Sequence, residues 1–485
     1  MKIVLSFCIC FVLINVTASA QPKTLHTFLE SQVGVTTKNI VPFWMRSNQY
    51  GSVPLSGGSV SLIAGAHIDY DTVKKRFVDW GVGFEGRTNT GNRSNFTLIE
   101  GYGKLKLGSF ELRAGRSKEI MGLVDSTLSS GAFSVSGNAI GIPKVQISVP
   151  EYTHLLGGKL FAFKGNFAHG WIGEVPIRYL DRGDETVQSN TYFHQSSLYM
   201  RLGKPDWRLK LYGGINHQVF WGEQKTLSEY KLNSVLETYL YVITGKTANN
   251  FSKVGNHLGS VDVGFQYEFP HYTLFVYRQN FYDVGALANL SNIKDGLNGI
   301  SIVNKAQTNS KFRWKKVLFE MLFTKNQAGY PTSKKTKSGD EDYYNNYVYK
   351  QGWIYNQENI GSPFLTTRTT ARRNLESIPG DYFINNRVLA FQTGIEGSVK
   401  QLHFIGKLSY SRNYGTFGTS IYGHSLGSER FPPKVIFKEV QQFSSYLEAN
   451  KQLKSGVHIG MSAAFDYGKL LENSVGVMWK VSKDF

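Results

Sequence analysis

The chain has 485 residues, a formal net charge of +18 and a slightly negative mean hydropathy. Length alone would allow two or three soluble domains, but glycine (50), tyrosine (27) and phenylalanine (32) are abundant while proline (13) is scarce. After residue 20 no stretch approaches the apolar length that a transmembrane helix needs, which is about 20 residues, so a helical membrane protein is excluded.

The first twenty residues have the features of an export signal. Lys2 gives a basic start, Ile3–Ile14 forms an apolar core, and Ala18-Ser19-Ala20 gives a small-x-small cleavage pattern. The core is too short to span a bilayer. We therefore expect a cleavable signal peptide over residues 1–20 and a single domain over residues 21–485.

Both cysteines, Cys8 and Cys10, fall inside this signal segment. Phe7 and Ile9 precede them, whereas a lipoprotein signal would have a small residue there, so lipidation is not expected. The chain after residue 20 has no cysteine and therefore no disulfide framework and no thiolate chemistry.

Segments that alternate apolar and polar residues follow one another along the chain. The alternation is clear in six segments: Asp79–Arg87, Trp207–Gly213, Ser260–Phe269, Val388–Val399, Leu402–Tyr410 and Gly456–Tyr467. Successive side chains of a strand point to opposite faces, so each segment has one apolar and one polar face. A soluble β-sandwich has the same alternation.

Three details favour a transmembrane barrel over the sandwich. The segments are about ten residues long, aromatic residues recur near their ends, and the polar face mixes glycine with charged residues, as a lumen would allow. A closed barrel also pairs every backbone group in lipid. Roughly fifteen to eighteen segments can be counted, and bacterial barrels have even strand numbers. We predict an all-β outer-membrane barrel.

The last residues support this prediction. Counting back from Phe485 by twos gives Lys483, Val481, Trp479, Val477 and Val475, an apolar row with one exception. A terminal phenylalanine in phase with such a row resembles the last-strand signal of outer-membrane proteins, in which the place of Lys483 is usually apolar.

Two stretches do not alternate. Ser117–Ile142 is expected to form a short helical or irregular insert. Pro331–Arg387 is long, polar and rich in Tyr, Asn, Arg and Gly, and a stretch of that length without regular structure is usually functional. In a barrel it would be an extracellular loop or a plug.

Two motifs suggest chemistry that their surroundings do not support. Gly423–Gly427 matches the nucleophile elbow around Ser425, but paired prolines follow where a helix is required, and only Glu429, Glu439 or Glu448 could serve as the acid before His458. Gly81–Gly86 matches a dinucleotide fingerprint inside a strand. The eleven histidines lack HxxxH and HExxH spacing, so no metal and no cofactor are expected.

Tyr343–Tyr355 interleaves aromatic residues with Asn and Gly. Aromatic faces stack on sugar rings, while Asn and Arg bond hydroxyls and carboxylates. The alternative is an aromatic girdle with a packed loop. The positive charge would attract anionic lipopolysaccharide or an anionic glycan, whereas nucleic acid is a distant alternative for an exported protein.

Several strings occur together in a characteristic order. They are Pro42–Gly51 (PFWMRSNQYG), Phe163–Gly165 with His169–Trp171, His194–Pro205 (HQSSLYMRLGKP), Gly214–Gln218 with Trp221–Gly222, Gly352–Tyr355, Ile360–Gly361 and Ile384–Val388. Over nearly all of the chain after the signal, this set resembles the capsule assembly protein Wzi family, in the branch found in the Bacteroidota.

The resemblance implies an outer-membrane barrel of about eighteen strands, with short helices closing its periplasmic end. It also implies a lectin that helps to attach capsular polysaccharide to the cell surface. We therefore expect a non-enzymatic, monomeric protein whose partners are capsular or other surface polysaccharide, outer-membrane lipid and lipopolysaccharide, and the outer-membrane assembly machinery. The family's loops diverge most, so its sugar-contacting residues cannot be mapped by motif.

The glycan-binding residues we predict from the chain are Trp353, Tyr355, Asn386, Arg387, Trp221 and His217. The alternatives are a passive porin and, more remotely, an esterase that uses Ser425. The basic residues of the long loop would attract an acidic polysaccharide in a salt-sensitive way; they are Lys334, Lys335, Lys337, Arg368, Arg372 and Arg373. Deleting Ser333–Arg373 should then abolish glycan retention; otherwise the site lies on the lumen face around Trp221.

Overall fold

A computed structural model of the chain describes residues 24–71, 76–91, 95–155, 157–179, 185–222, 234–246, 253–283, 285–306, 310–328, 341–420 and 435–485. The signal segment, Ser425 with its elbow, and Lys334, Lys335 and Lys337 lie outside these residues.

The eighteen strands of the main sheet are β1 (His26–Thr36), β2 (Ser59–Ile68), β3 (Val78–Gly91), β4 (Asn95–Leu107), β5 (Phe110–Arg116), β6 (Lys144–His154), β7 (Phe161–Tyr179), β8 (Glu185–Leu202), β9 (Leu209–Trp221), β10 (Asn256–Glu268), β11 (Tyr272–Tyr282), β12 (Gly296–Asn304), β13 (Phe312–Phe323), β18 (Val388–Val399), β19 (Leu402–Asn413), β20 (Val440–Gln452), β21 (Val457–Gly468) and β22 (Ser474–Asp484).

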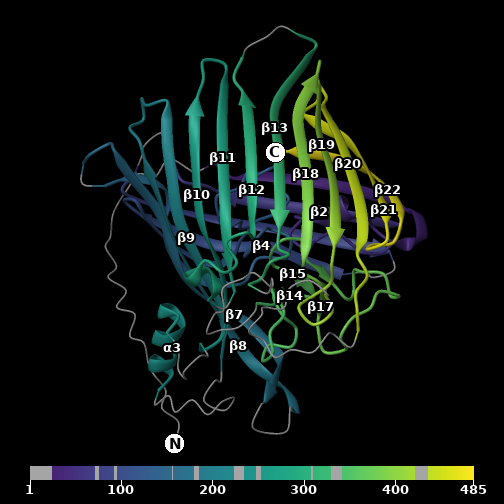
Figure 1. Ribbon diagram of the computed structural model, residues 1–485. Helices are drawn as coiled ribbons and strands as arrows, with labels where there is room; N and C mark the ends of the chain where they lie inside the picture. Colours follow the sequence, from purple (N-terminus) through teal and green to yellow (C-terminus); the bar gives the residue numbers. More distant parts are fainter. Residues whose placement is uncertain are drawn as a thin grey trace, which may run out of the picture.

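These strands form a closed antiparallel barrel (Figure 1). Each strand pairs with the next one along the chain, and β1 pairs with both β2 and β22, so that the first and last strands close the sheet. Val33 lies opposite Trp479 in this closing pair. Closure leaves no sheet edge unpaired, which is the requirement for strands that cross a lipid bilayer.

The pattern of burial shows which face of the barrel carries the apolar side chains. On β10, Val261 and Val263 are 37% and 50% exposed, whereas Ser260 and Asp262 between them are fully buried. The apolar residues therefore point outward and the polar ones into the barrel, the reverse of a soluble sandwich. This inversion is expected for a wall in contact with lipid.

The predicted strands are confirmed. Val388–Val399 is β18 as predicted. The other five alternating segments coincide with parts of β3, β9, β10, β19 and β21, and those in β9, β10 and β21 extend one or two residues beyond the strand. The terminal row is also confirmed, because Val475, Trp479, Val481 and Phe485 are exposed on the outer face of β22 and just beyond it. Gly81–Gly86 lies within β3, as its alternation predicts.

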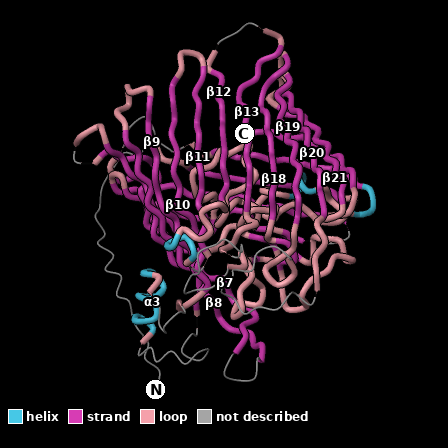
Figure 2. Tube along the Cα trace, viewed as in Figure 1, coloured by secondary structure: helices cyan, strands magenta, loops and turns pink. Residues whose placement is uncertain are grey.

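The two ends of the barrel differ. At one end, short turns such as residues 108–109 and 400–401 join the strands, and His26 and Phe485 lie there too. We call this the short-turn end. At the other, long-loop end, the connections include residues 37–58, 117–143, 324–328 and 341–387. Figure 2 shows loops gathered at the lower end of the barrel.

Short regular pieces occur in these long connections. They are η1 (Thr37–Asn39), α1 (Phe43–Arg46), α3 (Val235–Thr244), η3 (Ala286–Asn289) and two small hairpins, β14 (Ile354–Tyr355) with β15 (Glu358–Asn359) and β16 (Thr366–Thr367) with β17 (Phe383–Asn385). Among the described residues no helix has the length and apolar character to span a membrane.

The position of the helices differs from the expectation. The resemblance implies short helices at the periplasmic end, and outer-membrane barrels keep their short turns on that side. Here α1 and α3 both lie at the long-loop end. The reason is that α1 lies in the β1–β2 connection and α3 in the β9–β10 connection, and the antiparallel strands on either side of each connection meet at the long-loop end.

Candidate functional site

The insert between β5 and β6 lies inside the barrel. It contains no regular structure, and its backbone is held by side chains that point inward from the wall: Leu123 N donates to Asp262 of β10, 2.8 Å away, and Leu128 O accepts from Gln392 of β18, also at 2.8 Å. Ser130 N donates to Glu320 of β13 at 2.5 Å. In the eighteen-strand ring, β13 and β18 lie almost halfway round from β5 and β6, which the insert joins, so the insert crosses the bore.

The first part of the β13–β18 loop completes this plug. Its aromatic side chains pack in one buried cluster with inward residues of the wall. Phe133 of the insert stacks on Phe281 of β11 with ring centroids 4.0 Å apart, and Tyr344 of the loop bonds Phe133 O. The described loops therefore fill the lumen near the long-loop end.

Trp353 belongs to this packing. Its side chain is fully buried, its ring is stacked on Phe220 of β9 at 4.3 Å, and its Nε1 donates to Ser134 O at 2.8 Å. Tyr355 is half-buried and accepts a hydrogen bond from Arg116 at 2.9 Å. Both predicted stacking residues thus serve the plug in this structure.

Asn386 and Arg387 are also fully buried. The Asn386 amide donates to Asp342 at 2.6 Å and to Tyr343 O at 2.7 Å. The Arg387 guanidinium lies 5.8 Å from the Phe417 ring. These two residues connect the start of β18 to the loop and have no open surface for a ligand.

Trp221 and His217 lie in a different place from the other four. They point outward from β9, in phase with the exposed Ile215, and not into the lumen. His217 Nε2 lies 2.8 Å from His257 Nδ1, and the Trp221 ring lies 5.2 Å from that of Tyr239 on α3. The expectation of a lumen face around Trp221 is therefore wrong, because the phase of β9 sends this side chain to the outer face.

A buried carboxylate fastens the long loop where it leaves β13. Asp295, at the end of the β11–β12 connection, accepts from the backbone N–H groups of Asn326 at 2.8 Å and Gln327 at 2.6 Å. Tyr343 donates a third hydrogen bond at 2.9 Å. Burial raises the pKa of Asp295 to about 7, although these hydrogen bonds favour the charged form.

This pKa predicts the pH dependence of loop docking. Between an unfolded value near 4 and a folded value of about 7, the folded state holds a proton that the unfolded state has lost, so docking weakens as the pH rises through this window. We expect the Asn326 and Gln327 amides to exchange with solvent more readily at about pH 8 than at about pH 5, after correction for intrinsic rates. Equal protection at the two pH values would contradict this assignment.

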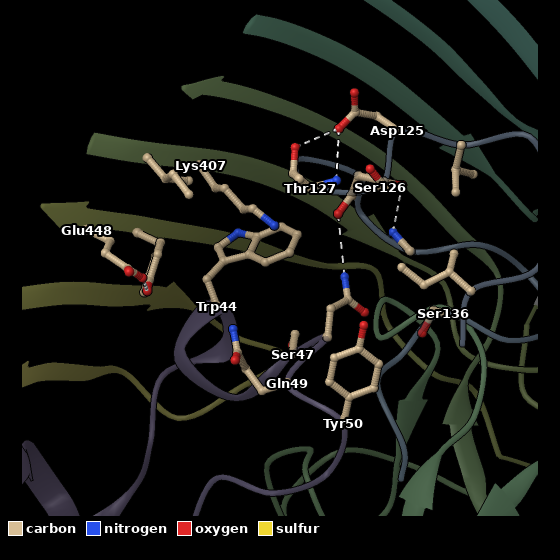
Figure 3. A pocket seen from close by; sticks show the side chains of 17 residues that line it. Trp44, Ser47, Gln49, Tyr50, Asp125, Ser126, Thr127, Ser136, Lys407 and Glu448 are labelled. Carbon is tan, nitrogen blue, oxygen red and sulfur yellow. Dashed lines mark hydrogen bonds between the residues drawn. The ribbon is translucent and has the colours of Figure 1, made fainter. Parts of the chain in front are cut away.

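A small cavity lies between the plug and the wall (Figure 3). Its volume is about 130 Å³, and Trp44, Asp125 and Lys407 contribute to its lining. Lys407 Nζ lies 5.0 Å from the Trp44 ring, and Asp125 accepts from Thr127 N at 3.0 Å. The cavity is too small for a polymer, because clefts that bind organic ligands typically have about 300–1,000 Å³.

A larger cleft opens at the long-loop end between the β1–β2 loop, the β13–β18 loop and the β21–β22 turn. Its volume is about 690 Å³. Its charged lining comprises Lys38, Arg46, Arg372, Arg373, Asp466 and Glu472, and Thr369, Thr370 and Asn374 add hydroxyl and amide groups. We call this the basic cleft.

Arg372 builds one side of the basic cleft. Its Nε donates to Leu471 O at 2.8 Å, and a terminal nitrogen donates to Gly468 O and to Asn473, both at 2.9 Å. The β13–β18 loop is thus fixed to the β21–β22 turn. Arg373 beside it is exposed, as is Lys38 across the cleft.

Sequence reasoning identified Arg372 and Arg373 as loop cations but missed Lys38 and Arg46. Arg46 lies in the Pro42–Gly51 string, whose residues pointed to the family without suggesting a role for its charge. Arg368, which was also predicted as a glycan-attracting cation, donates to Ser377, Ile378 O and Asp381 O and organises its own loop.

Ser425 lies outside the described residues, and the other residues of the esterase alternative make contacts of their own. His458 begins β21 at the short-turn end. Glu448 bonds Asn450 at 2.8 Å and lies 3.1 Å from Lys480 in the lumen, and Glu439 pairs with Arg412 at 2.6 Å. Among the described residues no group of three or more His, Cys, Asp or Glu side chains could hold a metal ion.

The chain is similar to several solved structures. OccAB2 of Acinetobacter baumannii is 10% identical with a TM-score of 0.44, over 95% of this chain and 98% of that one. OccK5 (OpdH) of Pseudomonas aeruginosa is 11% identical with a TM-score of 0.45, over the same shares. None of the curated proteins matches the chain.

The sequence pattern of one protein family matches most of the chain. The pattern is described as capsule assembly protein Wzi, and it matches residues 47–368, which run from the β1–β2 loop to the basic residues of the long loop. The closed barrel and the family together point to the outer membrane and to a non-enzymatic protein. The chain belongs to the capsule assembly protein Wzi family.

Proposed function

We propose that this protein binds an acidic surface polysaccharide, capsular polysaccharide in the first place, and helps to hold it at the cell surface. The observation that carries the proposal is the basic cleft. It is open at the long-loop end, it has the volume of a ligand site, and it combines four basic with two acidic residues.

The end of the barrel at which the basic cleft opens supports a ligand outside the cell. Outer-membrane barrels place long loops on the extracellular side, so the cleft would face the capsule. Its hydroxyl and amide groups can bond sugar hydroxyls, and its cations can pair with carboxylate groups. The family's link to capsule assembly agrees with this ligand.

The test replaces the two exposed cations, Lys38 and Arg373, with alanine together. Each exposed charge contributes up to about 1 kcal/mol to an ionic contact, so we expect roughly tenfold weaker binding of an acidic polysaccharide and a smaller salt dependence. Binding can be measured by titration calorimetry with the purified full chain.

The matched control is Lys454→Ala, which removes one exposed charge from the short turn between β20 and β21. This control should bind as the parent does. If the double variant and the control bind equally, the polysaccharide does not use the basic cleft.

A passive porin is the second candidate function, since the lumen wall is polar. The described plug speaks against it, because the insert and the long loop fill the bore near the long-loop end. We therefore expect the intact protein to conduct no current in planar bilayers.

A further inference from the structure

Helix α3 lies on the outside of the barrel wall rather than over its mouth (Figure 1). The wall beneath it is the outward face of β8 and β9, since Tyr192 and His194 are in phase with the exposed Leu198, and Trp221 is in phase with the exposed Ile215. The helix therefore covers side chains that would otherwise face lipid or the membrane surface.

Specific contacts dock the inner face of α3 on this wall. Val242 is fully buried in a cluster with Val219, Trp221 and Val254. Tyr239 packs on Trp221, and its hydroxyl lies 3.3 Å from His194 Nδ1. The helix thus gives the outward imidazole of His194 a polar partner, which matters where no water is available.

The ends of α3 are well defined. Ser234 caps the N-terminus by accepting from Glu237 N at 3.0 Å. Gly245 ends the helix with a φ of 61°, the left-handed conformation that glycine adopts readily. The helix therefore begins and ends at defined residues within the β9–β10 connection.

The other face of α3 is apolar. Leu236 and Leu240 are 68% and 49% exposed, and the half-buried Ile243 lies on the same side, because positions i, i+4 and i+7 of a helix share one face. Exposed leucine side chains next to one another would be unfavourable in water. Their exposure calls for an apolar surrounding.

We propose that α3 lies in the outer leaflet at the boundary between headgroups and acyl chains, with Leu236, Leu240 and Ile243 inserted among the lipids. The stripe continues the lipid-facing apolar surface of the adjoining strands β8–β10, which includes Leu198, Ile215 and Val261. Trp171, which is 46% exposed on neighbouring β7, marks the same level, as interfacial aromatic residues do. Lys246 just beyond the helix can reach anionic headgroups.

The test uses single-cysteine probes in a background with Cys8 and Cys10, the chain's two cysteines, replaced by serine. Leu236→Cys and Leu240→Cys, each carrying an environment-sensitive fluorophore, are placed in bilayers whose acyl chains are brominated. Val263→Cys on the lipid-facing wall is the positive control, and Arg373→Cys in the basic cleft is the negative control. Heat-modifiable migration confirms that each variant has a folded barrel.

The expected result is loss of fluorescence at Leu236 and Leu240 similar to that at Val263, with little loss at Arg373. Quenching as low as at Arg373 would overturn the proposal. Absence of quenching together with concentration-dependent crosslinking through Leu236→Cys would assign the stripe to a second copy instead and would equally overturn it. Neither result depends on polysaccharide binding.

Discussion

Replacing Met121–Asn138 with a short glycine–serine linker is expected to convert a silent barrel into a conducting pore. The insert joins β5 to β6 and is bound by side chains on the far part of the wall, among them Gln392 of β18, so it fills the bore. Once it is removed, the inward side chains face water and can line a channel, as the polar lumen of porins does. Single-channel recording in planar bilayers measures the effect.

The matched control places the same linker in the segment Asn374–Gly380 of the long loop, which is partly exposed. That variant should remain silent, since its segment does not cross the lumen. If the parent protein conducts steadily, the described plug is not in place in the bilayer. If removal of the insert leaves the barrel silent, the long loop alone closes the bore.

Trp353→Ala is expected to release the long loop while leaving the barrel intact. The change removes a fully buried indole that stacks on Phe220 and bonds Ser134 O. Large-to-small changes of this kind lower the free energy of unfolding by about 3–5 kcal/mol. That loss is large compared with the free energy that keeps a single loop docked. Protease cleavage within residues 341–387 should become rapid, while heat-modifiable migration of the barrel persists because the strand pairing of the wall is unchanged.

Tyr347→Ala is the control on the same loop, because Tyr347 is 51% exposed. It should leave the loop protected. Trp353→Phe separates packing from sugar stacking: if Trp353 only supports the plug, this variant should restore protection and leave polysaccharide binding at the parental level. If Trp353→Phe loses polysaccharide binding while the loop stays protected from protease, Trp353 contributes to the ligand site.

The strands were predictable because their information is local. In β10 and β18 each residue's character follows from which of two faces it points to, and that pattern repeats every second residue. Inversion of the faces could be inferred from glycine and charged residues on one side and aromatic residues on the other. The number of strands, in contrast, came from the resemblance to the family.

The site was not predictable in the same way. Trp353 and Arg387 have the residue types of a ligand site, but only contacts that are distant in sequence, such as Trp353 with Ser134, show that they are buried. The basic cleft brings Lys38 together with Arg373 and Glu472, which are far apart in the chain. No local pattern carries that proximity.

Deleting Ser333–Arg373 is therefore not a specific test of glycan binding. Within the described residues it would remove Tyr343, Tyr344 and Trp353, which form the plug, along with the basic residues of the cleft. A loss of retention would not separate the two effects. Substitutions at Lys38 and Arg373 change the charge of the cleft and leave the plug in place.

The most direct test of the central claim is the affinity of the purified full chain for an acidic capsular polysaccharide at low and at physiological salt. We expect the chain to bind the acidic polysaccharide at low salt and to bind it markedly more weakly at physiological salt, because exposed charges are screened beyond about 8 Å there. A neutral polysaccharide of similar size should bind much more weakly at both. No binding at low salt, or an affinity that does not depend on salt, would contradict the claim that the basic cleft holds an acidic glycan.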